Sequence, residues 1–434
     1  MNENRKLYMQ IYDYYKDLIE TGKLPEGTRL PSIRRCAEER NVSKTTVETA
    51  YMCLCDDGYV LPKNQSGYYV SNRGILTVKQ EIKNEKSNQK TEILYDFASS
   101  GVDAESFNMD IWRRYVKSAL RQNERLLFYG DPQGEYDLRC EIAKYARETR
   151  NCVCTEENIV IGAGVQTLLN ILCPLIKHKK TACFDDLSYR QGTAIFNDYG
   201  FKVNDNREAS NIIYTSPSYS TRWGDVMSVK ERFELTEYAR QNNKLIIEDD
   251  YGSEFRYFNR PMPSLQGLDR GENTVYLGTF SKLLFPSIRI SFMILPQSLT
   301  ARYKKKKELY NQTVSKADQI ALCSYIRDGH LNSQIRKSTK IYSQKSKILT
   351  DLLLENFKND VQILRTNSPL YVRCKFNKKY SANDLCRMAE KQGVLLIPAN
   401  TQTDFPEIAF SVAAVGQNSL SEGVKILKKV VRNS

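Results

Sequence analysis

The chain has 434 residues, 41% of them hydrophobic, and its 64 basic residues outnumber 51 acidic ones to give a formal net charge of +13. This length and composition predict two or three domains with substantial cores. The lack of a signal peptide or long apolar run argues against a membrane protein and predicts a soluble, cytoplasmic one. Eleven cysteines without a CxxC pair indicate a reducing compartment, and they argue against a disulfide framework or a metal site.

Residues 1–71 are expected to form a small domain of three helices and a hairpin. The segment NVSKTTVETAYMCL predicts a helix that begins after a cap at Ser43 and places Val47, Tyr51 and Leu54 on one face. The other face is short and polar, which suits a helix whose start contacts phosphates and base edges in the major groove of DNA.

Candidate DNA contacts lie at this helix start, in the preceding helix region and in the hairpin turn: Arg34, Ser43, Lys44, Thr45, Thr46, Gln65 and Gly67. Arg34, expected just before the second helix of the pair, can clamp a phosphate or a guanine edge, and Gln65 can probe the minor groove as a wing. A small helical domain can carry such a set by accident. The order of the pieces, with LPSIR and the closing GYVLPKNQSGYYV, resembles a GntR-type winged helix-turn-helix domain.

Residues 72–92 are rich in charge and poor in apolar side chains, so we expect a flexible, solvated linker. A loose tether lets a change in the following domain alter how the DNA-reading heads are spaced, without a rigid path through the protein.

A glycine-rich turn in ENIVIGAGVQTLLNIL joins an expected strand to an expected helix. The free backbone N–H groups around Gly164, Val165 and Gln166 at the helix start attract phosphate, although such a turn can also mark only a tight bend. Farther along, CFDDLSYRQG places Tyr189 just after a short apolar strand. Its ring can stack over a cofactor or simply pack in the core.

The segment KLIIEDDYGSEFRY reads as a buried strand that runs into three acidic residues and then Tyr251. A carboxylate here can pair with a pyridine nitrogen and keep it protonated, and we choose Asp249 for this position. The Tyr251 phenol can hydrogen-bond the ring hydroxyl. The alternative is that the acidic triplet only solvates a loop.

The run LGTFSKLLFPSIR, residues 277–289, carries a lysine in a small, hydroxyl-rich turn. Lys282 can form an imine with an aldehyde cofactor, while Thr279, Ser281 and the fork of Arg289 can hold a phosphate dianion. Alone, such a lysine is more often a solvated surface residue. Together with the segments above, it predicts a pyridoxal 5′-phosphate site.

These segments and YGDPQGEYDLRCEIAKYARETR at 129–150 resemble the fold type I, aspartate aminotransferase-like enzymes. The resemblance implies an α/β effector domain over residues 93–434, in which a mixed, mostly parallel sheet is followed by a small C-terminal α/β subdomain from about residue 315. It implies the Schiff-base role for Lys282 and the pyridine-nitrogen contact for Asp249. It assigns the remaining cofactor contacts to Tyr251, Tyr189, Thr279, Ser281, Arg289, Val165 and Gln166.

A GntR-type domain fused to such a domain resembles the MocR/GabR transcriptional regulators along the whole chain. The resemblance implies a bacterial regulator that binds operator DNA, carries pyridoxal 5′-phosphate and forms a head-to-tail homodimer.

Three departures from the family pattern bear on the effector. The loop SPSYSTRWG replaces a TPSHQ[FY]PTG-like loop, which reshapes the pocket wall. The region around PEIAFSVAAVGQ lacks the arginine that commonly holds an amino-acid carboxylate, and a buried Glu407 there would repel one, although Arg190 or Arg222 can substitute. Gln191 stands where a GABA-responsive member is expected to use an arginine, so GABA is not expected as the effector.

Two functions therefore remain open. One is a regulator that senses an amine effector or pyridoxal 5′-phosphate itself, with no enzymatic role. The other is an active aminotransferase whose DNA-binding domain is autoregulatory. The missing carboxylate clamp and the DNA-reading domain favour the regulator.

Basic residues concentrate in residues 301–350, where twelve Lys and Arg face three acids and KKKK occupies 304–307. This run is a solvated helix face, or it adds nonspecific phosphate contacts along bent DNA.

Overall fold

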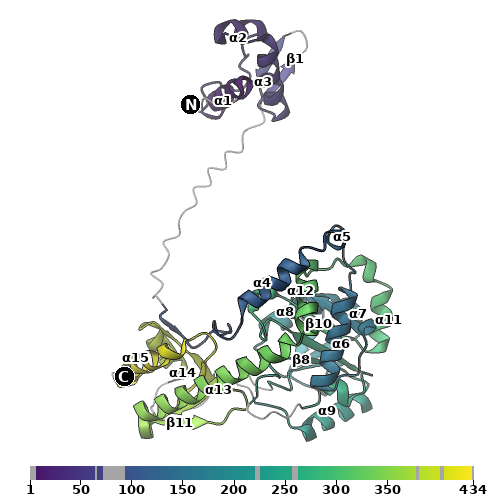
Figure 1. Ribbon diagram of the computed structural model, residues 1–434, viewed down its shortest axis with the longest axis vertical. Helices are drawn as coiled ribbons and strands as arrows, with labels where there is room; N and C mark the ends of the chain where they lie inside the picture. The colour runs from purple at the N-terminus through teal and green to yellow at the C-terminus, as the bar shows by residue number, and fades with distance from the viewer. Residues whose placement is uncertain are drawn as a thin grey trace. The chain divides into compact units, whose positions relative to one another are not determined.

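The computed structural model of the chain describes residues 6–63, 66–71, 93–219, 225–256, 262–377, 381–400 and 405–432. It divides into two compact units, Met1–Lys90 and Thr91–Ser434, which are described separately below (Figure 1). The predicted linker 72–92, the candidate wing residue Gln65 and Arg222 lie outside the described residues.

The first unit contains three helices and a hairpin: α1 (Leu7–Glu20), α2 (Ile33–Arg40), α3 (Lys44–Asp56), β1 (Val60–Lys63) and β2 (Gly67–Val70). The strands pair antiparallel. Helix α3 begins at the predicted cap, because the Ser43 hydroxyl accepts a hydrogen bond from the Thr46 amide at 3.1 Å. The predicted face of α3 is fully buried, and the Tyr51 ring meets the rings of Tyr15 and Tyr68 edge-on at 5.6 and 5.1 Å.

One prediction in this unit is wrong in its detail. Arg34 is the second residue of α2, so it lies at the start of the first helix of the pair and not just before α3, the second helix. The reason is that Ser32 accepts a hydrogen bond from the Arg35 amide and so starts the helix one residue before Arg34.

The second unit is built on a seven-stranded sheet of order β4-β10-β9-β8-β7-β5-β6. Its strands are β4 (Ile159–Gly162), β5 (Thr181–Phe184), β6 (Lys202–Asn204), β7 (Ile212–Thr215), β8 (Leu245–Asp250), β9 (Thr274–Thr279) and β10 (Ser291–Ile294). All run parallel except β10, which is antiparallel to both of its neighbours. The predicted mixed, mostly parallel sheet is therefore confirmed.

Helices cover both faces of this sheet (Figure 1). They are α4 (Met109–Ala119), α5 (Asn123–Leu126), α6 (Tyr136–Arg150), α7 (Val165–Ile176), α8 (Arg190–Asp198), α9 (Val229–Gln241), α10 (Leu265–Leu268), α11 (Gln297–Lys304) and α12 (Lys316–Arg327). Alternate residues of one strand belong to different cores, since Ile159 and Ile161 pack with residues of α6 and Val160 packs with residues of α7. Because both faces are buried, the strands are continuous apolar runs.

The C-terminal part adds a four-stranded antiparallel sheet of order β11-β12-β15-β14. Its elements are α13 (His330–Phe357), β11 (Val361–Leu364), β12 (Tyr371–Phe376), α14 (Ala382–Glu390), β13 (Val394–Leu395), β14 (Ile397–Asn400), β15 (Glu407–Ser411) and α15 (Leu420–Arg432). Strand β3 (Tyr95–Asp96), at the beginning of the unit, pairs in parallel with β13. The first described residues of the unit are therefore part of this C-terminal layer.

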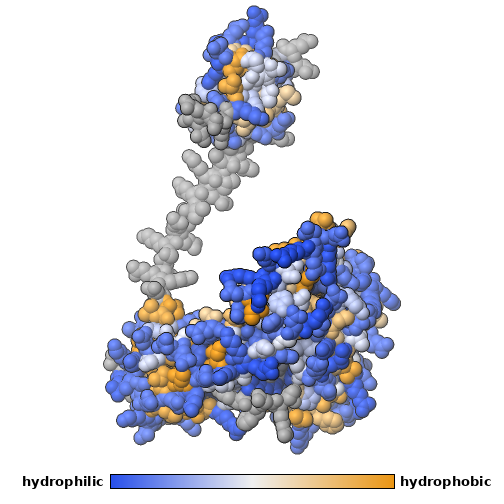
Figure 2. Space-filling view, in the orientation of Figure 1, coloured by the Kyte–Doolittle hydropathy of each residue, from blue (hydrophilic) through white to orange (hydrophobic). Residues whose placement is uncertain are grey.

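An apolar loop is exposed at the end of α5. Leu127, Phe128 and Tyr129 are 82%, 73% and 103% exposed. Figure 2 shows hydrophobic surface over this helix, at the edge of the second unit. Large apolar side chains gathered at one exposed place indicate a contact surface.

All eleven cysteines are free thiols. Within the described ranges, no helix is long and apolar enough to cross a membrane, and no group of three or more His, Cys, Asp or Glu side chains could hold a metal ion.

The Ser43 cap gives a test of the first unit. We expect Ser43→Ala to destabilise α3 by about 1 kcal/mol, because the Thr46 amide loses its acceptor. Hydrogen exchange of the α3 amides in the full-length chain should be faster by roughly fivefold, since 1.4 kcal/mol corresponds to a factor of about 10. Glu48→Ala, on the exposed face of the same helix, should leave exchange nearly unchanged. Equal protection in both variants would contradict the capping role.

Candidate functional site

The predicted cofactor segments all follow strands of the seven-stranded sheet. Parallel strands end at the same edge of a sheet, and this is the edge where α/β folds bind ligands. The ends of β8 and β9 are adjacent, with Asp249 opposite Leu277. Ser291 of β10 pairs with both Thr279 and Gly162, so the glycine-rich turn after β4 lies near the end of β9. The sheet therefore brings these loops together.

A cavity of about 330 Å³ lies at this edge. It contains three of the predicted site residues, Tyr189, Asp249 and Tyr251. Its other lining residues are Asp185, Asp186, Ser188, Gln191, Tyr214, Thr215, Ser216, Tyr219 and Tyr371. Five aromatic rings, the predicted Tyr189 and Tyr251 and three others, therefore line the cavity, which suits a flat ligand ring.

Asp249 is held by a residue that sequence reasoning missed. The Tyr214 hydroxyl donates a hydrogen bond to Asp249 Oδ2 at 2.6 Å. Burial raises the pKa of Asp249 to about 6, and the hydrogen bond from Tyr214 opposes that rise. The register pairs Tyr214 with Ile247, on the same face of β8 as Asp249, so strand alternation could have found this partner.

Tyr189 precedes α8 and lies over a glycine. A Cβ on Gly192 would come within 2.3 Å of the Tyr189 ring, so only glycine permits this ring position. The ring lies 5.7 Å from that of Tyr214 at an angle of 31°. Tyr251, directly after β8, packs edge-on against Tyr219 at 5.6 Å. The Tyr219 that replaces a family histidine is thus part of the aromatic wall.

Lys282 is buried, and the alternative of a solvated surface lysine is wrong. Its side chain is 4% exposed, and Nζ donates hydrogen bonds to the backbone carbonyls of Ser100 and Gly101, both at 3.0 Å. Burial lowers the pKa of the Lys282 ammonium to about 8. The amine is held at these carbonyls, and Lys282 is not among the residues that line the cavity.

The predicted phosphate contacts form a second cluster. The Arg289 guanidinium lies so close to Gly164 that a Cβ there would be 2.3 Å from Nη2. Helix α7 begins beside it without a side-chain cap, so the backbone N–H groups of Val165 and Gln166 lack partners within the helix. Thr279 is occupied, because its hydroxyl accepts from the Ser281 amide and the Ser291 hydroxyl.

Two buried hydroxyls without a partner show that this region fits a polar ligand. Ser281 Oγ, between Thr279 and Lys282, and Thr215 Oγ1, at the cavity wall, have no hydrogen-bond partner among the described residues. Buried polar atoms are normally paired, so such atoms point to a ligand. Together with the Arg289 guanidinium at the start of α7, and with the Asp249 carboxylate that lines the same cavity as Thr215, the residues present fit a phosphate joined to an aromatic ring.

The acidic triplet does not solvate a loop, so that alternative is wrong. Asp250 is buried and accepts from the Arg150 guanidinium at 2.6 Å, and Tyr276, Ser218 and Ser253 also donate to it. Glu248, also buried, accepts from a backbone amide at the start of α10 at 3.0 Å. The reason is that β8 is a central strand covered on both faces, so its carboxylates need internal partners.

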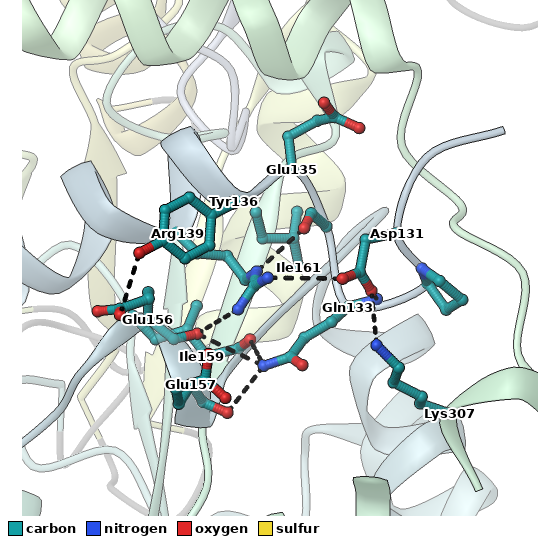
Figure 3. A network of polar contacts seen from close by, with 12 residues as sticks. Asp131, Gln133, Glu135, Tyr136, Arg139, Glu156, Glu157, Ile159, Ile161 and Lys307 are labelled. Carbon is teal, nitrogen blue, oxygen red and sulfur yellow. Dashed lines mark hydrogen bonds and ion pairs between the residues drawn. The ribbon is translucent and has the colours of Figure 1, made fainter. Parts of the chain in front are cut away.

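The YGDPQGEYDLR segment is fixed to the beginning of β4 by a polar network (Figure 3). Arg139 donates to the carbonyls of Gly134 and Glu156 at 3.0 and 2.6 Å. The Gln133 amide donates to two further carbonyls, of Glu157 and Ile159, at 2.9 and 2.8 Å. This network fixes the segment that follows the exposed loop Leu127–Tyr129 in the chain.

The lysine run at 304–307 contributes to the same network. Lys307 lies 3.6 Å from Asp131, and Lys304 pairs with Glu157. Two of the four lysines are therefore engaged within the unit, and the DNA contact of the run stays a prediction.

The candidate DNA contacts gather at the start of α3. Lys44 and Thr45 are exposed there, whereas Ser43 and Thr46 share a hydrogen bond between their hydroxyls at 2.7 Å. Arg34 pairs with Glu38 on the surface of α2. Gly67 begins β2 with φ of 106°, a conformation that favours glycine.

Glu407 is buried, as expected, but it is paired. Arg373 on the neighbouring strand β12 donates to Glu407 Oε2 at 3.1 Å and also lies 3.5 Å from Asp225. Sequence reasoning missed Arg373, because the partner comes from a strand more than thirty residues away in the chain.

Comparison with known proteins identifies two family matches. Residues 7–70 match the bacterial regulatory proteins of the gntR family, and residues 102–210 and 204–427 match the aminotransferases of class I and II. YdeL, an uncharacterized HTH-type transcriptional regulator of Bacillus subtilis (strain 168), is 32% identical over 97% of this chain and 96% of its own. MocR of Rhizobium meliloti, a probable rhizopine catabolism regulatory protein, is 26% identical over 91% of this chain and 87% of its own.

Solved structures resemble the second unit in fold. Kynurenine aminotransferase of Pyrococcus horikoshii, solved with PMP, aligns with a TM-score of 0.68 and 20% identity over 79% of this chain and 91% of that one. At this level of identity the similarity shows an aminotransferase fold.

The buried ion pair behind the site gives a stability test. Asp250→Asn leaves the Arg150 charge buried without its partner, so we expect a loss of about 3–5 kcal/mol in the free energy of unfolding. Glu234→Ala removes an exposed helix ion pair with Lys230 and should cost no more than about 1 kcal/mol. Urea unfolding of the full-length chain measures both. Equal losses would show that the buried pair is not an anchor.

The burial of Lys282 gives a pH test. Reaction with an aldehyde needs the uncharged amine, which predominates above a pKa of about 8 here but only above about 10.4 for an exposed lysine. The rate at which pyridoxal 5′-phosphate develops colour with the protein should therefore rise to a plateau with a midpoint near pH 8. Lys282→Arg should show no such colour. A midpoint near pH 10 would contradict the buried site.

Proposed function

The chain belongs to the HTH-type transcriptional regulators that join a gntR-family DNA-binding domain to an aminotransferase class I and II domain, and we propose that its second unit binds pyridoxal 5′-phosphate and senses an amine effector or the cofactor itself. The observation that carries this proposal is the buried amine of Lys282, at the end of β9, with a lowered pKa and with unpaired polar atoms close by in the chain.

Each residue of the site has a proposed task toward the cofactor. When bound, pyridoxal 5′-phosphate supplies an electrophilic aldehyde and an electron-withdrawing ring. Lys282 provides the attachment amine, Asp249 keeps a proton on the ring nitrogen, and Tyr214 orients Asp249. Tyr189 covers a face of the ring, and Tyr251 addresses its hydroxyl. The phosphate is assigned to Arg289, Ser281, Thr279 and the backbone at Val165 and Gln166.

We propose that the effector role is sensing and not turnover of amino acids. The support is the Glu407–Arg373 pair, which places a carboxylate near the C-terminal strand and occupies the nearby guanidinium. A substrate carboxylate would meet a charge of its own sign there.

The first unit supplies the DNA contacts. The support is the exposed start of α3, where Lys44 makes no ion pair with a described residue and the exposed Thr45 hydroxyl lies 3.2 Å from that of Ser43, so both can reach phosphates and base edges. Ser43 and Thr46 are assigned to holding the helix start, in addition to the DNA contact predicted for them. Arg34, Gly67 and Gln65 remain candidates for the flanking backbone and the wing.

We propose a homodimer in which a second copy of the chain covers the loop Leu127–Tyr129. The support is the exposure of three large apolar side chains on a loop whose Phe128 carbonyl accepts a hydrogen bond from Lys316 at 2.9 Å. Burying these side chains against a second copy would remove apolar surface from water, which favours association. The head-to-tail arrangement of the two copies remains a prediction.

Operator binding by the full-length chain tests the proposal. A DNA site selected on the purified protein should bind with an affinity that changes when pyridoxal 5′-phosphate is added. Lys282→Ala should bind the same site but show no response to the cofactor, because the attachment amine is gone. Lys44→Ala should weaken binding and lower the slope of affinity against salt by about 1, since one phosphate contact is lost.

Lys425→Ala is the matched control, because Lys425 is exposed on α15, outside the predicted DNA contacts, and makes no ion pair with a described residue. It should leave the cofactor response intact. A Lys282→Ala protein that responds to pyridoxal 5′-phosphate as the natural chain does would refute the sensor role of this site.

A further inference from the structure

Acidic side chains outnumber basic ones around the cavity at the sheet edge. Three carboxylates line it, those of Asp185, Asp186 and Asp249, and its lining residues include no lysine or arginine. A cavity lined by one sign of charge concentrates ligands of the opposite sign.

The three carboxylates differ in how far they are neutralised. Asp185 is matched by Arg207, which donates to both of its oxygens at 2.8 and 2.6 Å. Asp249 carries the Tyr214 hydrogen bond and is assigned to the cofactor nitrogen. Asp186 accepts a backbone hydrogen bond from Ser188 at 2.8 Å and has no ion pair within the described chain. Asp186 is therefore the carboxylate left for a ligand.

The strand on the opposite side of the site adds to this negative charge. Tyr371 of β12 lines the cavity, and Arg373 follows it on the same face of the strand. Arg373 is held between Glu407 and Asp225, two carboxylates for one guanidinium. Two carboxylates therefore face one guanidinium here, so a ligand ammonium finds an excess of acid.

A buried hydroxyl of the cavity wall also points to a polar ligand. Thr215 lines it, is 1% exposed, and its Oγ1 has no hydrogen-bond partner within the described chain. A buried hydroxyl without a partner costs free energy, and a ligand N–H group would supply that partner.

We propose that the effector is a primary amine with a second positively charged end and no carboxylate, that is, a diamine. This inference rests on the proposed function, because one end of the diamine must reach the cofactor at Lys282. The other end lies against Asp186, and the Glu407 and Asp225 carboxylates favour the same charge. Selectivity then comes from the sign of charge at the far end of the ligand, not from its length.

Three probes of matched length test this selectivity: 1,4-diaminobutane, 1-aminobutane and 4-aminobutanoate. Calorimetry and the absorbance of the full-length protein loaded with pyridoxal 5′-phosphate give a dissociation constant for each. We expect the diamine to bind at least about tenfold more tightly than the monoamine, and the amino acid to bind most weakly. Equal constants for all three, or tightest binding of 4-aminobutanoate, would overturn the proposal.

Substitutions test which carboxylates cause the preference for the diamine. Asp186→Asn should reduce the advantage of the diamine over the monoamine by about fivefold or more. Asp198→Asn, which removes a charge outside the cavity at the end of α8, should preserve it. Glu407→Gln should release Arg373 and tighten binding of 4-aminobutanoate. An unchanged preference in Asp186→Asn and Glu407→Gln would overturn the assignment.

Different results refute the proposed function and the diamine proposal. A protein that takes up no pyridoxal 5′-phosphate refutes the proposed function and the diamine with it. A protein that takes up the cofactor through Lys282 but prefers the amino acid refutes only the diamine.

Discussion

Three consecutive carboxylates at the end of a buried central strand must each find a partner, and the second unit is organised around how they do so. Side chains alternate across a strand, so Glu248 and Asp250 point to one face of β8 and Asp249 to the other. Glu248 accepts an amide of α10 and Asp250 binds Arg150 at the end of α6. These two contacts tie helices to the sheet behind the site. Asp249 is left with one phenol, and its remaining capacity faces the cavity.

Lys282, like these carboxylates, is buried and needs partners inside the unit. Its ammonium is buried, and it is satisfied by two carbonyls of the segment around Ser100 and Gly101. That segment continues from β3, which pairs with β13 of the C-terminal layer, and in the chain it comes soon after residues 72–92. A ligand that engages the Lys282 amine therefore competes with the contacts that hold the first residues of this unit. The hydrogen bonds that hold the Lys282 amine are therefore the same ones that hold the segment around Ser100 and Gly101 near the beginning of this unit.

The sequence predicted the elements and the strand ends well, because both follow local patterns. Each such pattern depends on residues that are close together in the sequence, as in the face of α3 with Val47 and Tyr51, the cap at Ser43 and the turn at Gly164. The partners were not predictable in this way. Tyr214, Arg150 and Arg373 come from other strands and helices, and only the sheet order and register place them beside Asp249, Asp250 and Glu407. Local sequence propensity does not determine burial. The sequence therefore left open whether Lys282 and the acidic triplet at 248–250 are solvated or buried.

The proposed cofactor site depends on which amine of the protein reacts with the cofactor. Reduction of the full-length protein with borohydride in the presence of pyridoxal 5′-phosphate, followed by peptide mapping, identifies that amine directly. We predict a single phosphopyridoxyl group on the peptide that contains Lys282. Labelling spread over surface lysines, with Lys282 unmodified, would contradict the central claim.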